Sequence, residues 1–481
     1  MLLAKALSEG GLTMKKNKFL WLITGVFTMS LMSGCGSSGK IVVTIGMWPE
    51  SQQLKDIAMF NIWKERFETD HPEYEIVGEP YTYSVETVHA KAQANKLPTV
   101  FQTWFTEPSM LVSNHYIKDV TADLKELGWY EKMDPEMRAN LTFDDKVYGV
   151  PRDGYGLGLF LNLGLLRDYG ILSDNNDDGK VDIYDEEGKP LYPTTFEDIY
   201  NVSSTIAELS EGQTQGMLIL TSNKNGGWQF SNIAWNFGAE LEKEVDGKWV
   251  GTLNDPKAVE ALEWIQKMKA EDLLPPNTTI SYSDWYTKIT SQVAMAFVGS
   301  DVISLAVTNG GMNKDDIAFV PMPAGPYGDR YSLFGGTPYV FSSSSSDEAT
   351  KGAIMFLEYM GRSPETSSAS LKAMREGNNV AYEKGNPIIP TIKPWINDDY
   401  LEAASALEDE FVNVDMTYFH EFFDTVKTLR HSEVPYYAQE MYTLLDTAIQ
   451  AIFVDPYTTS ASAQLTTANS TFNKQYMSKL S

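Results

Sequence analysis

Apolar and polar positions along the chain follow two different periods. Lys40–Met47 (KIVVTIGM) is rich in β-branched residues and alternates in polarity, which predicts a strand. After it, Leu54, Ala58 and Ile62 fall on one face of a helix that would begin after a capping Ser51 and end near Thr69. This succession of strand and helix recurs along the chain and predicts an α/β fold with a parallel-rich sheet.

The same two periods predict the remaining elements. Strands are expected at Tyr74–Tyr81, Thr99–Thr103, Lys146–Pro151, Gly156–Asn162, Val293–Val298, Phe319–Met322 and Pro338–Ser342. Helices are expected at Glu86–Asn95, Met110–Tyr116, Thr121–Leu127, Pro135–Asn140, Thr195–Leu209 and Trp285–Ser291, and through most of the chain after Pro364. Asp255 is expected to cap a helix that has Pro256 in its first turn. Ser345 and Glu348 are expected to form the capping box of a helix over Glu348–Met360.

The N-terminal segment has the pattern of a targeting sequence. Basic residues from Lys15 to Lys18 precede an apolar run over Phe19–Met32, which has the length of a signal-peptide core. The residues MSGC that end at Cys35 resemble a bacterial lipobox, so residues 1–34 are expected to be a signal peptide, with Met14 as its true start. Cys35 would carry a diacylglyceryl anchor on the extracellular face of the cell membrane, followed by a tether over residues 35–39.

Composition narrows the class of partner. The chain has 481 residues, 43% of them hydrophobic, which is enough for a globular protein of two or three domains. Its net charge of −27 argues against nucleic acid as a partner. Cys35 is the only cysteine, which excludes disulfides and thiolate zinc sites.

The stretch DNNDDGKVDIYD has the spacing of a twelve-residue calcium loop. Side-chain oxygens recur at alternate positions, a glycine follows at the sixth place, and two more carboxylates complete the pattern. The expected ligands of a structural Ca²⁺ ion are Asp174, Asn176, Asp178, Lys180 through its carbonyl, Asp182 and Asp185. The last position departs from an EF-hand because it holds Asp rather than Glu, as in dockerin-type loops. The alternative is a solvated acidic turn.

Four segments resemble the extracellular solute-binding proteins of ABC sugar importers, the maltose-binding-protein-like class. They are Trp48–Pro72, Leu97–Thr121, Val147–Ile171 followed by TTFEDI at Thr194–Ile199, and Gln292–Asp301 with the later PMPAGP and FGG. The calcium loop separates the two parts of the third segment, which the family joins directly. The loop is therefore read as an insertion at residues 174–185.

The resemblance implies a two-lobe periplasmic-binding-protein fold of type II, with a hinge and a ligand cleft between the lobes. The N-terminal lobe would comprise residues 40–153 and 337–380, and the C-terminal lobe residues 154–336 and 381–481. The chain would cross between lobes near Asp153, near Gly335–Gly336 and near residue 380. A monomer that binds a carbohydrate and hands it to an ABC permease is expected.

Aromatic residues at positions without helical or strand periodicity suggest a sugar site. The chain has 11 Trp and 25 Tyr, and sugar C–H faces stack on aromatic rings while their hydroxyls bond to polar groups. Trp48 and Glu50 leave the first strand at its carboxyl end, where open α/β sheets place ligands, although packing and capping explain them equally well. Glycines before Trp228 suggest a loop tip, whereas Trp235 is expected in the core. The expected ligand contacts, several of them placed by the resemblance alone, are Trp48, Glu50, Trp104, Glu107, Asp153, Tyr155, Trp228, Asp301, Gly336 and Tyr437.

Catalytic motifs do not support an enzyme. The five histidines are scattered and form no HExxH motif, and the chain contains no GxSxG nucleophile motif. A lipid-anchored carbohydrate-binding protein is therefore expected. A cell-surface glycoside hydrolase and a sensory lipoprotein on the same fold are the alternatives.

Overall fold

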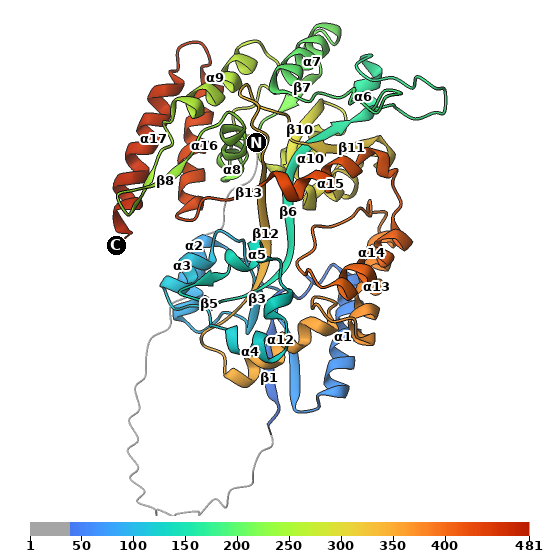
Figure 1. Ribbon diagram of the computed structural model, residues 1–481, viewed down its shortest axis with the longest axis vertical. Helices are drawn as coiled ribbons and strands as arrows, with labels where there is room; N and C mark the ends of the chain where they lie inside the picture. The colour runs from blue at the N-terminus through green and yellow to red at the C-terminus, as the bar shows by residue number, and fades with distance from the viewer. Residues whose placement is uncertain (1–38, 481) are drawn as a thin grey trace, which may run out of the picture. The chain divides into compact units, whose positions relative to one another are not determined.

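The computed structural model describes residues 39–480 and contains one nine-stranded mixed sheet with helices on both faces (Figure 1). The strand order is β2-β1-β3-β12-β6-β10-β7, with β11 paired to β6 and β13 paired to β12. These strands are β1 (Ile41–Ile45), β2 (Tyr74–Gly78), β3 (Val100–Gln102), β6 (Val150–Asn162), β7 (Gln215–Leu218), β10 (Val293–Gly299), β11 (Ile317–Pro321), β12 (Ser332–Phe341) and β13 (Arg430–Ser432). Two hairpins lie apart from the sheet: β4 (Thr142–Phe143) with β5 (Lys146–Val147), and β8 (Glu242–Val245) with β9 (Lys248–Gly251).

Helices cover the sheet and flank the hairpins. They are α1 (Leu54–Asp70), α2 (Val85–Gln93), α3 (Pro108–Ser113), α4 (Thr121–Glu126), α5 (Pro135–Ala139), α6 (Leu163–Asp168), α7 (Phe196–Leu209), α8 (Asn225–Asn236), α9 (Pro256–Ala270), α10 (Tyr282–Lys288), α11 (Ile303–Thr308), α12 (Asp347–Tyr359), α13 (Ser368–Glu383), α14 (Asp398–Phe411), α15 (His420–Leu429), α16 (Ala438–Val454) and α17 (Ala461–Gln475). Among the residues that the structure describes, no helix combines the length and the apolar character needed to cross a membrane.

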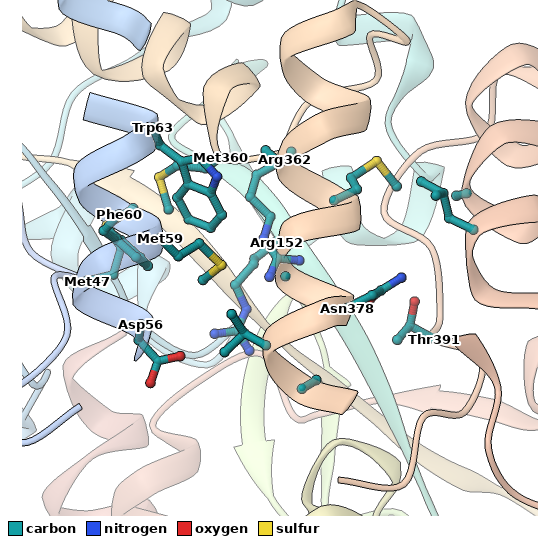
Figure 2. A pocket seen from close by; sticks show the side chains of 18 of the residues that line it. Met47, Asp56, Met59, Phe60, Trp63, Arg152, Met360, Arg362, Asn378 and Thr391 are labelled. Carbon is teal, nitrogen blue, oxygen red and sulfur yellow. The ribbon is translucent and has the colours of Figure 1, made fainter. Parts of the chain in front are cut away.

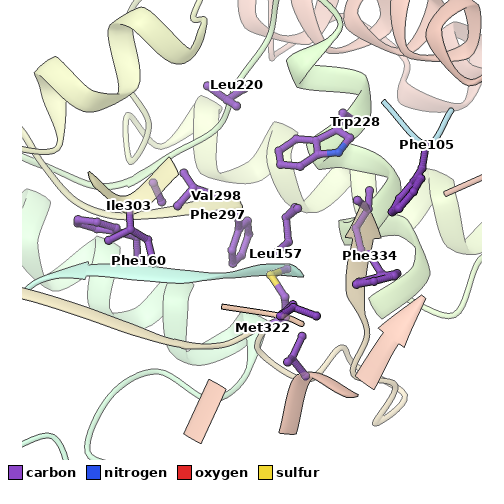
Figure 3. Packing of buried hydrophobic residues seen from close by; sticks show 14 of the residues in the cluster. Phe105, Leu157, Phe160, Leu220, Trp228, Phe297, Val298, Ile303, Met322 and Phe334 are labelled. Atoms are coloured by element: carbon purple, nitrogen blue, oxygen red, sulfur yellow. The ribbon is translucent and has the colours of Figure 1, made fainter. Parts of the chain in front are cut away.

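Two long antiparallel strands join the two ends of the sheet. The first half of β6 pairs with β12 up to Gly156, and the second half pairs with β10 and β11 from Leu157 onward. That second half is a continuous buried apolar run because helices cover both of its faces. Leu157, Phe297 and Phe334 belong to the core cluster shown in Figure 3. We call the part built on β1, β2 and β3 the first lobe, and the part built on β7, β10 and β11 the second lobe.

The sequence prediction had divided β6 into two strands. Pro151 and Gly154 read as an interruption, yet the strand continues through both. Pro151 lies opposite Pro338 where the register with β12 shifts, so two residues that lack an N–H donor share one irregular position.

The third passage between the lobes occurs later than predicted. Helix α13 runs unbroken through residue 380, and it packs against α1 and α14. The turn at Met416–Tyr418 and α15 both pack against β11 of the second lobe, so the chain returns after Phe411. The predicted boundary at 380–381 was therefore wrong, because helical periodicity shows that a face is buried without showing which lobe buries it.

Helix caps confirm one sequence prediction and correct two others. Asp255 accepts a hydrogen bond from the Lys257 amide beside Pro256, as predicted. Thr195 forms a capping box with Asp198, which was not predicted. Gln53 rather than Ser51 precedes α1. Ser346, not Ser345, accepts from the Ala349 amide at the start of α12. In a run of serines, the residue that caps is the one whose backbone stands one place before the helix.

Helix α8 was absent from the prediction because its first turn contains Gly226 and Gly227. In the structure these glycines allow a close helix contact: a Cβ on Gly227 would lie 2.3 Å from the carbonyl oxygen of Tyr442 on α16. The expected loop tip at Trp228 was therefore wrong, since Trp228 lies inside α8 and is 8% exposed. The core position expected for Trp235 is confirmed.

Candidate functional site

A cavity of about 510 Å³ lies between residues of the two lobes. The first lobe contributes Glu86, Trp104 and Thr337, and the second lobe contributes the larger share. Its lining comprises Glu86, Trp104, Tyr155, Asn223, Lys224, Asn225, Trp228, Tyr282, Asp301, Val302, Thr337, Glu433, Gln439 and Tyr442. Four of the ten predicted ligand contacts are brought together here: Trp104, Tyr155, Trp228 and Asp301. We call this cavity the cleft.

Trp104 stands on the first-lobe side of the cleft, two residues after β3. Its side chain is 40% exposed, which is unusual for an indole and leaves a ring face open to a ligand. Tyr83 supports the other side, with its ring edge-to-face at 5.4 Å. The Tyr83 hydroxyl in turn donates to the carboxylate of Glu107, which is 3% exposed. Glu107 therefore acts through Tyr83 and does not line the cleft.

Three aromatic rings form the facing wall. Tyr155 lies 6.1 Å from Trp228, and Trp228 lies 6.0 Å from Tyr282, all measured between ring centroids. Tyr155 belongs to β6, where Gly335 of the neighbouring strand leaves room for its ring. The N-terminus of α8 is held by Asp446 of α16, which accepts hydrogen bonds from the amides of Lys224 and Gly227. This contact fixes Trp228 within the wall.

Carboxyl groups supply hydrogen-bond acceptors beside the aromatic wall. Burial raises the pKa of Glu433 to about 7, and Tyr442 donates its hydroxyl hydrogen to one Glu433 oxygen at 2.8 Å. The other oxygen, Oε2, is buried and has no hydrogen-bond partner among the described residues. Burial, followed by the charge of Asp153, raises the pKa of Asp301 to about 7 as well. Asp301 is nevertheless exposed in the cleft, so solvent screens its charge more than that of the half-buried Glu433.

Two polar contacts cross the cleft from lobe to lobe. Lys224 Nζ lies 3.0 Å from Glu86 Oε1, and Gln439 Nε2 donates to Thr106 Oγ1 at 3.1 Å. Hydrogen bonds from Ser84, from its own backbone amide and from Lys224, in that order, lower the pKa of Glu86 to about 2, so Glu86 is ionised at neutral pH. These contacts bridge the two lobes in this arrangement, and the Lys224–Glu86 pair is partly exposed to solvent.

The other predicted contacts lie outside the cleft. Trp48 and Glu50 line a neighbouring cavity of about 350 Å³ at the end of β1. The carboxylate of Asp153 pairs with Arg152. Gly336 packs against Phe105, with which any side chain at this position would collide. Tyr437 stands before α16 in a left-handed conformation, with its ring 5.7 Å from that of Tyr476.

Sequence reasoning missed most of the second-lobe lining. Glu433 and Gln439 carry no local signal, because a single carboxylate or amide in a helical region resembles any surface residue. Tyr442 shares a tyrosine-rich segment with Tyr437, and only the direction of α16 decides which of the two faces the cleft.

The acidic stretch forms a compact loop with oxygens in its interior. Asp174 and Asn176 accept hydrogen bonds from the amides of Asp178 and Gly179, and Gly179 has φ of +86°. Asp182 accepts from the Asn175 amide at 2.7 Å. These hydrogen bonds close the turn through side-chain oxygens of the predicted ligand set.

The twelfth position does not fit in the same way. Asp185 Oδ1 accepts hydrogen bonds from the amides of Glu187 and Lys189 in a separate turn. As the side chains stand, no three acidic, histidine or cysteine groups within residues 39–480 are gathered closely enough to hold a metal ion. The loop is tied to the second lobe by Lys180, whose Nζ lies 2.6 Å from Asp415 Oδ2. Beyond the loop, the Tyr184 and Tyr192 hydroxyls both donate to Glu421 of α15.

The predicted signal peptide at 1–34 and the lipidation site at Cys35 lie outside the described residues.

Comparison with known proteins gives a family and a fold. Residues 63–377 match the family described as bacterial extracellular solute-binding protein. No curated protein matches the sequence.

Solved structures with the same fold are distant in sequence. A maltose-bound protein of T. maritima has 18% identity and a TM-score of 0.62, over 90% of this chain and 99% of that chain. An ABC-transporter solute-binding protein from Thermotoga lettingae, bound to α-D-tagatose, has 15% identity and a TM-score of 0.66, over 90% of this chain and 99% of that chain. An ABC substrate-binding protein of Listeria monocytogenes, in complex with cycloalternan, has 13% identity and a TM-score of 0.66, over 90% and 98%. These likenesses confirm the predicted two-lobe α/β fold.

Proposed function

Because the chain belongs to the family of bacterial extracellular solute-binding proteins, we propose that it captures an oligosaccharide in the cleft and delivers it to the permease of an ABC importer. The observation that carries the proposal is the pair of aromatic surfaces on opposite lobes, Trp104 on one side and Trp228 with Tyr155 on the other. Maltose, tagatose and cycloalternan in structures of the same fold support a saccharide as the ligand class.

The arrangement suits a sugar for a chemical reason. Aromatic faces accept the C–H faces of a sugar ring, and the unpartnered oxygen of Glu433 accepts a hydroxyl hydrogen. The family binds solutes and does not convert them, so the function is capture and release without turnover. Closure of the two lobes around the ligand would reform the contact between Lys224 and Glu86.

Isothermal titration calorimetry against a panel of oligosaccharides tests the proposal. We expect saturable binding of at least one member, and no release of reducing sugar over time. Failure of every saccharide to bind, together with tight binding of a peptide or a metal chelate, would overturn the sugar assignment. Release of reducing sugar would favour a glycoside hydrolase instead.

The binding of sugar is expected to weaken as the pH falls. A hydroxyl that donates to Glu433 requires the ionised carboxylate, and the pKa of Glu433 is raised to about 7 by burial. Lowering the pH from about 8 to about 6 protonates this group and weakens it as an acceptor, so affinity should drop across that interval. The Glu433→Gln variant should depend less on pH than the wild type in calorimetric titrations, and Asp301, whose pKa is also raised to about 7, accounts for the dependence that remains. A wild-type affinity that stays constant across the interval would remove Glu433 from the ligand contacts.

We propose that Cys35 carries a lipid anchor and that the protein acts at the outer face of the membrane as a monomer. The support is the basic and apolar segment before Cys35 and the polar, glycine-rich residues after it. In cell fractionation, the wild-type chain is expected in the membrane pellet and the Cys35→Ala variant in the soluble or precursor fraction. Equal distribution of both would contradict lipidation at Cys35.

The acidic loop is proposed to bind Ca²⁺ through Asp174, Asn176, Asp178, Lys180, Asp182 and Asp185. Asp174 and Asn176 already accept hydrogen bonds from amides within the loop, and bound calcium would neutralise the charges of the aspartates while Asp185 moves from its separate turn.

Chelation is expected to lower the melting temperature. If calcium had been present at a hundred times its Kd, its removal should lower the free energy of unfolding by about 2.7 kcal/mol. Sugar affinity should change little while the protein stays folded, because the loop lines no part of the cleft. The Asp178→Ala variant should no longer respond to chelator, and Asp144→Asn, in another acidic turn, should respond like the wild type. If chelation abolished sugar binding without loss of stability, the loop would belong to the ligand site.

A further inference from the structure

The charged side chains that line the cleft are mostly acidic. Glu86, Asp301 and Glu433 bear carboxyl groups, and Lys224 is the only basic residue that the described part of the chain places in the lining. Lys224 pairs with Glu86, so these two charges cancel. No lysine, arginine or histidine among the described residues lies within ion-pair distance of Asp301 or Glu433. The cleft therefore keeps two carboxyl groups that no cation of the protein pairs with.

Arg152 is the cation whose charge reaches Asp301, and it is paired elsewhere. Burial is the main reason that the pKa of Asp301 is raised to about 7, while the charge of Asp153 adds to the rise and that of Arg152 opposes it. The Arg152 Nε atom lies 2.6 Å from Asp153 Oδ2. Figure 2 shows the Arg152 side chain in a separate cavity of about 560 Å³ in the first lobe, which shares no lining residue with the cleft. Asp301 is therefore left without a counterion.

Asp301 lies against the aromatic wall of the cleft. It follows β10, and a Cβ added to Gly299 would stand 2.4 Å from Asp301 Oδ1 and 3.3 Å from Cδ2 of Tyr155, so the carboxylate and this ring adjoin. The charge of Asp301 also adds to burial in raising the pKa of Tyr282. Trp228 contacts both tyrosine rings, at 6.1 Å and 6.0 Å between centroids. One unpaired carboxylate thus stands beside a set of three aromatic rings.

A carboxylate beside aromatic faces suits an organic ammonium group. The face of a tyrosine or tryptophan ring attracts a cation within about 6 Å of its centre, and a carboxylate accepts charge-assisted hydrogen bonds from N–H donors. A metal ion such as Ca²⁺ would need about six to eight oxygen ligands instead. Within residues 39–480, no three acidic, histidine or cysteine groups are gathered closely enough to hold one. A bound ammonium group would also favour the ionised form of Asp301.

We propose that the oligosaccharide captured in the cleft carries a protonated amino group, as a hexosamine unit does, and that Asp301 binds this group against the rings of Tyr155 and Tyr282. The inference rests on the function proposed above. Glu433 supplies a second negative charge, which reaches the same ring, since it adds to burial in raising the pKa of Tyr155. Its Oε2 atom remains the acceptor for a sugar hydroxyl.

Calorimetry with matched disaccharides tests the amine site at a pH of about 7. Glucose disaccharides of α-1,4, β-1,4 and β-1,3 linkage are each compared with two counterparts, in which the carbon-2 hydroxyls are replaced by amines or by N-acetyl groups. The amine is protonated at this pH, whereas the hydroxyl and the amide are neutral. For at least one linkage, the wild-type protein is expected to bind the amino form at least about tenfold more tightly than both neutral forms.

Three variants assign the preference to its residues. Asp301→Asn keeps the shape of the side chain and removes its charge, so it should abolish the preference for the amino form and change the affinity for the neutral forms less. Glu433→Gln should reduce the preference only in part. Asp424→Asn is the matched control, because Asp424 is an exposed acid on α15 of the same lobe that lines no part of the cleft, and it should keep the preference. Circular dichroism shows whether each variant is folded.

Each other outcome decides between the two proposals. If amino and neutral forms bind equally at every linkage, or if Asp301→Asn keeps the preference, the amine site is wrong and the sugar assignment stands. A loss of preference in Asp424→Asn as large as in Asp301→Asn would show that net charge, not a site, attracts the amine. If spermidine binds in a manner that depends on Asp301 and no saccharide binds, the amine contact is upheld and the sugar assignment is overturned. If neither binds, both proposals fail.

Discussion

Trp104→Ala is expected to weaken oligosaccharide binding by about 1–3 kcal/mol, or roughly 5- to 150-fold in Kd. The exposed indole at the end of β3 would lose both the stack on a sugar ring and the apolar area that the ligand covers. Folding should be nearly unaffected, because the side chain is 40% exposed and its contact is the edge of Tyr83. Calorimetric titration with the tightest ligand of the panel gives the difference directly.

Two further variants separate stacking from other causes. Trp104→Phe keeps an aromatic face and should retain part of the affinity. Tyr457→Ala removes a ring that is 75% exposed and absent from the cleft lining, so it should bind like the wild type. An unchanged Kd for Trp104→Ala would remove this residue from the site and leave the first lobe without its aromatic contact.

Gly227→Ala is expected to destabilise the second lobe strongly. The added Cβ would lie 2.3 Å from the Tyr442 carbonyl oxygen and 2.4 Å from its Cα, and backbone atoms cannot move aside by rotamer change. Helix α8 would have to move away from α16, at a cost of about 1–3 kcal/mol or more. The same movement would displace Trp228 and disturb the hydrogen bond from the Gly227 amide to Asp446. Urea unfolding should therefore show a lower midpoint, and sugar affinity should fall with it.

Gly377→Ala is the matched control for this helix contact. Gly377 also lies inside a helix, α13, but no neighbouring atom stands within 4 Å of the place that an added Cβ would take. Alanine there should raise stability by roughly 0.5–1 kcal/mol, since it reduces the freedom of the unfolded chain. Equal effects of the two substitutions would show that helix propensity, rather than the contact with Tyr442, determines the outcome.

Local patterns in the sequence were sufficient for the fold class and for many elements. Alternating β-branched residues located β1, a short apolar run located β10, and the pair Asp255–Pro256 located the start of α9. The same patterns misplaced elements where tertiary contacts override local preference. Gly226 and Gly227 resemble a loop, but they are required where two helices meet, and Pro151 resembles a strand end, but it falls on an irregular position of a long strand.

The candidate ligand contacts also divide into those that the sequence predicted and those that only tertiary contacts bring to the cleft. Trp104 was found because it follows a recognisable strand, and Tyr155 because the family resemblance placed it where the chain crosses between the lobes. The structure brings both to the cleft. Glu433 and Tyr282 reach the cleft only because distant segments fold onto β6, and their immediate neighbours in sequence give no sign of it. Glu107 shows the reverse error, since its place beside Trp104 in sequence suggested ligand contact, whereas its carboxylate is buried under Tyr83.

The crystal structure of the protein with the tightest oligosaccharide of the panel tests the central claim most directly. We predict a sugar ring against the open face of Trp104, a second contact with the wall formed by Tyr155, Trp228 and Tyr282, and a sugar hydroxyl within hydrogen-bond distance of Glu433 Oε2. A saccharide bound elsewhere on the protein, with the cleft filled only by water, would contradict the account.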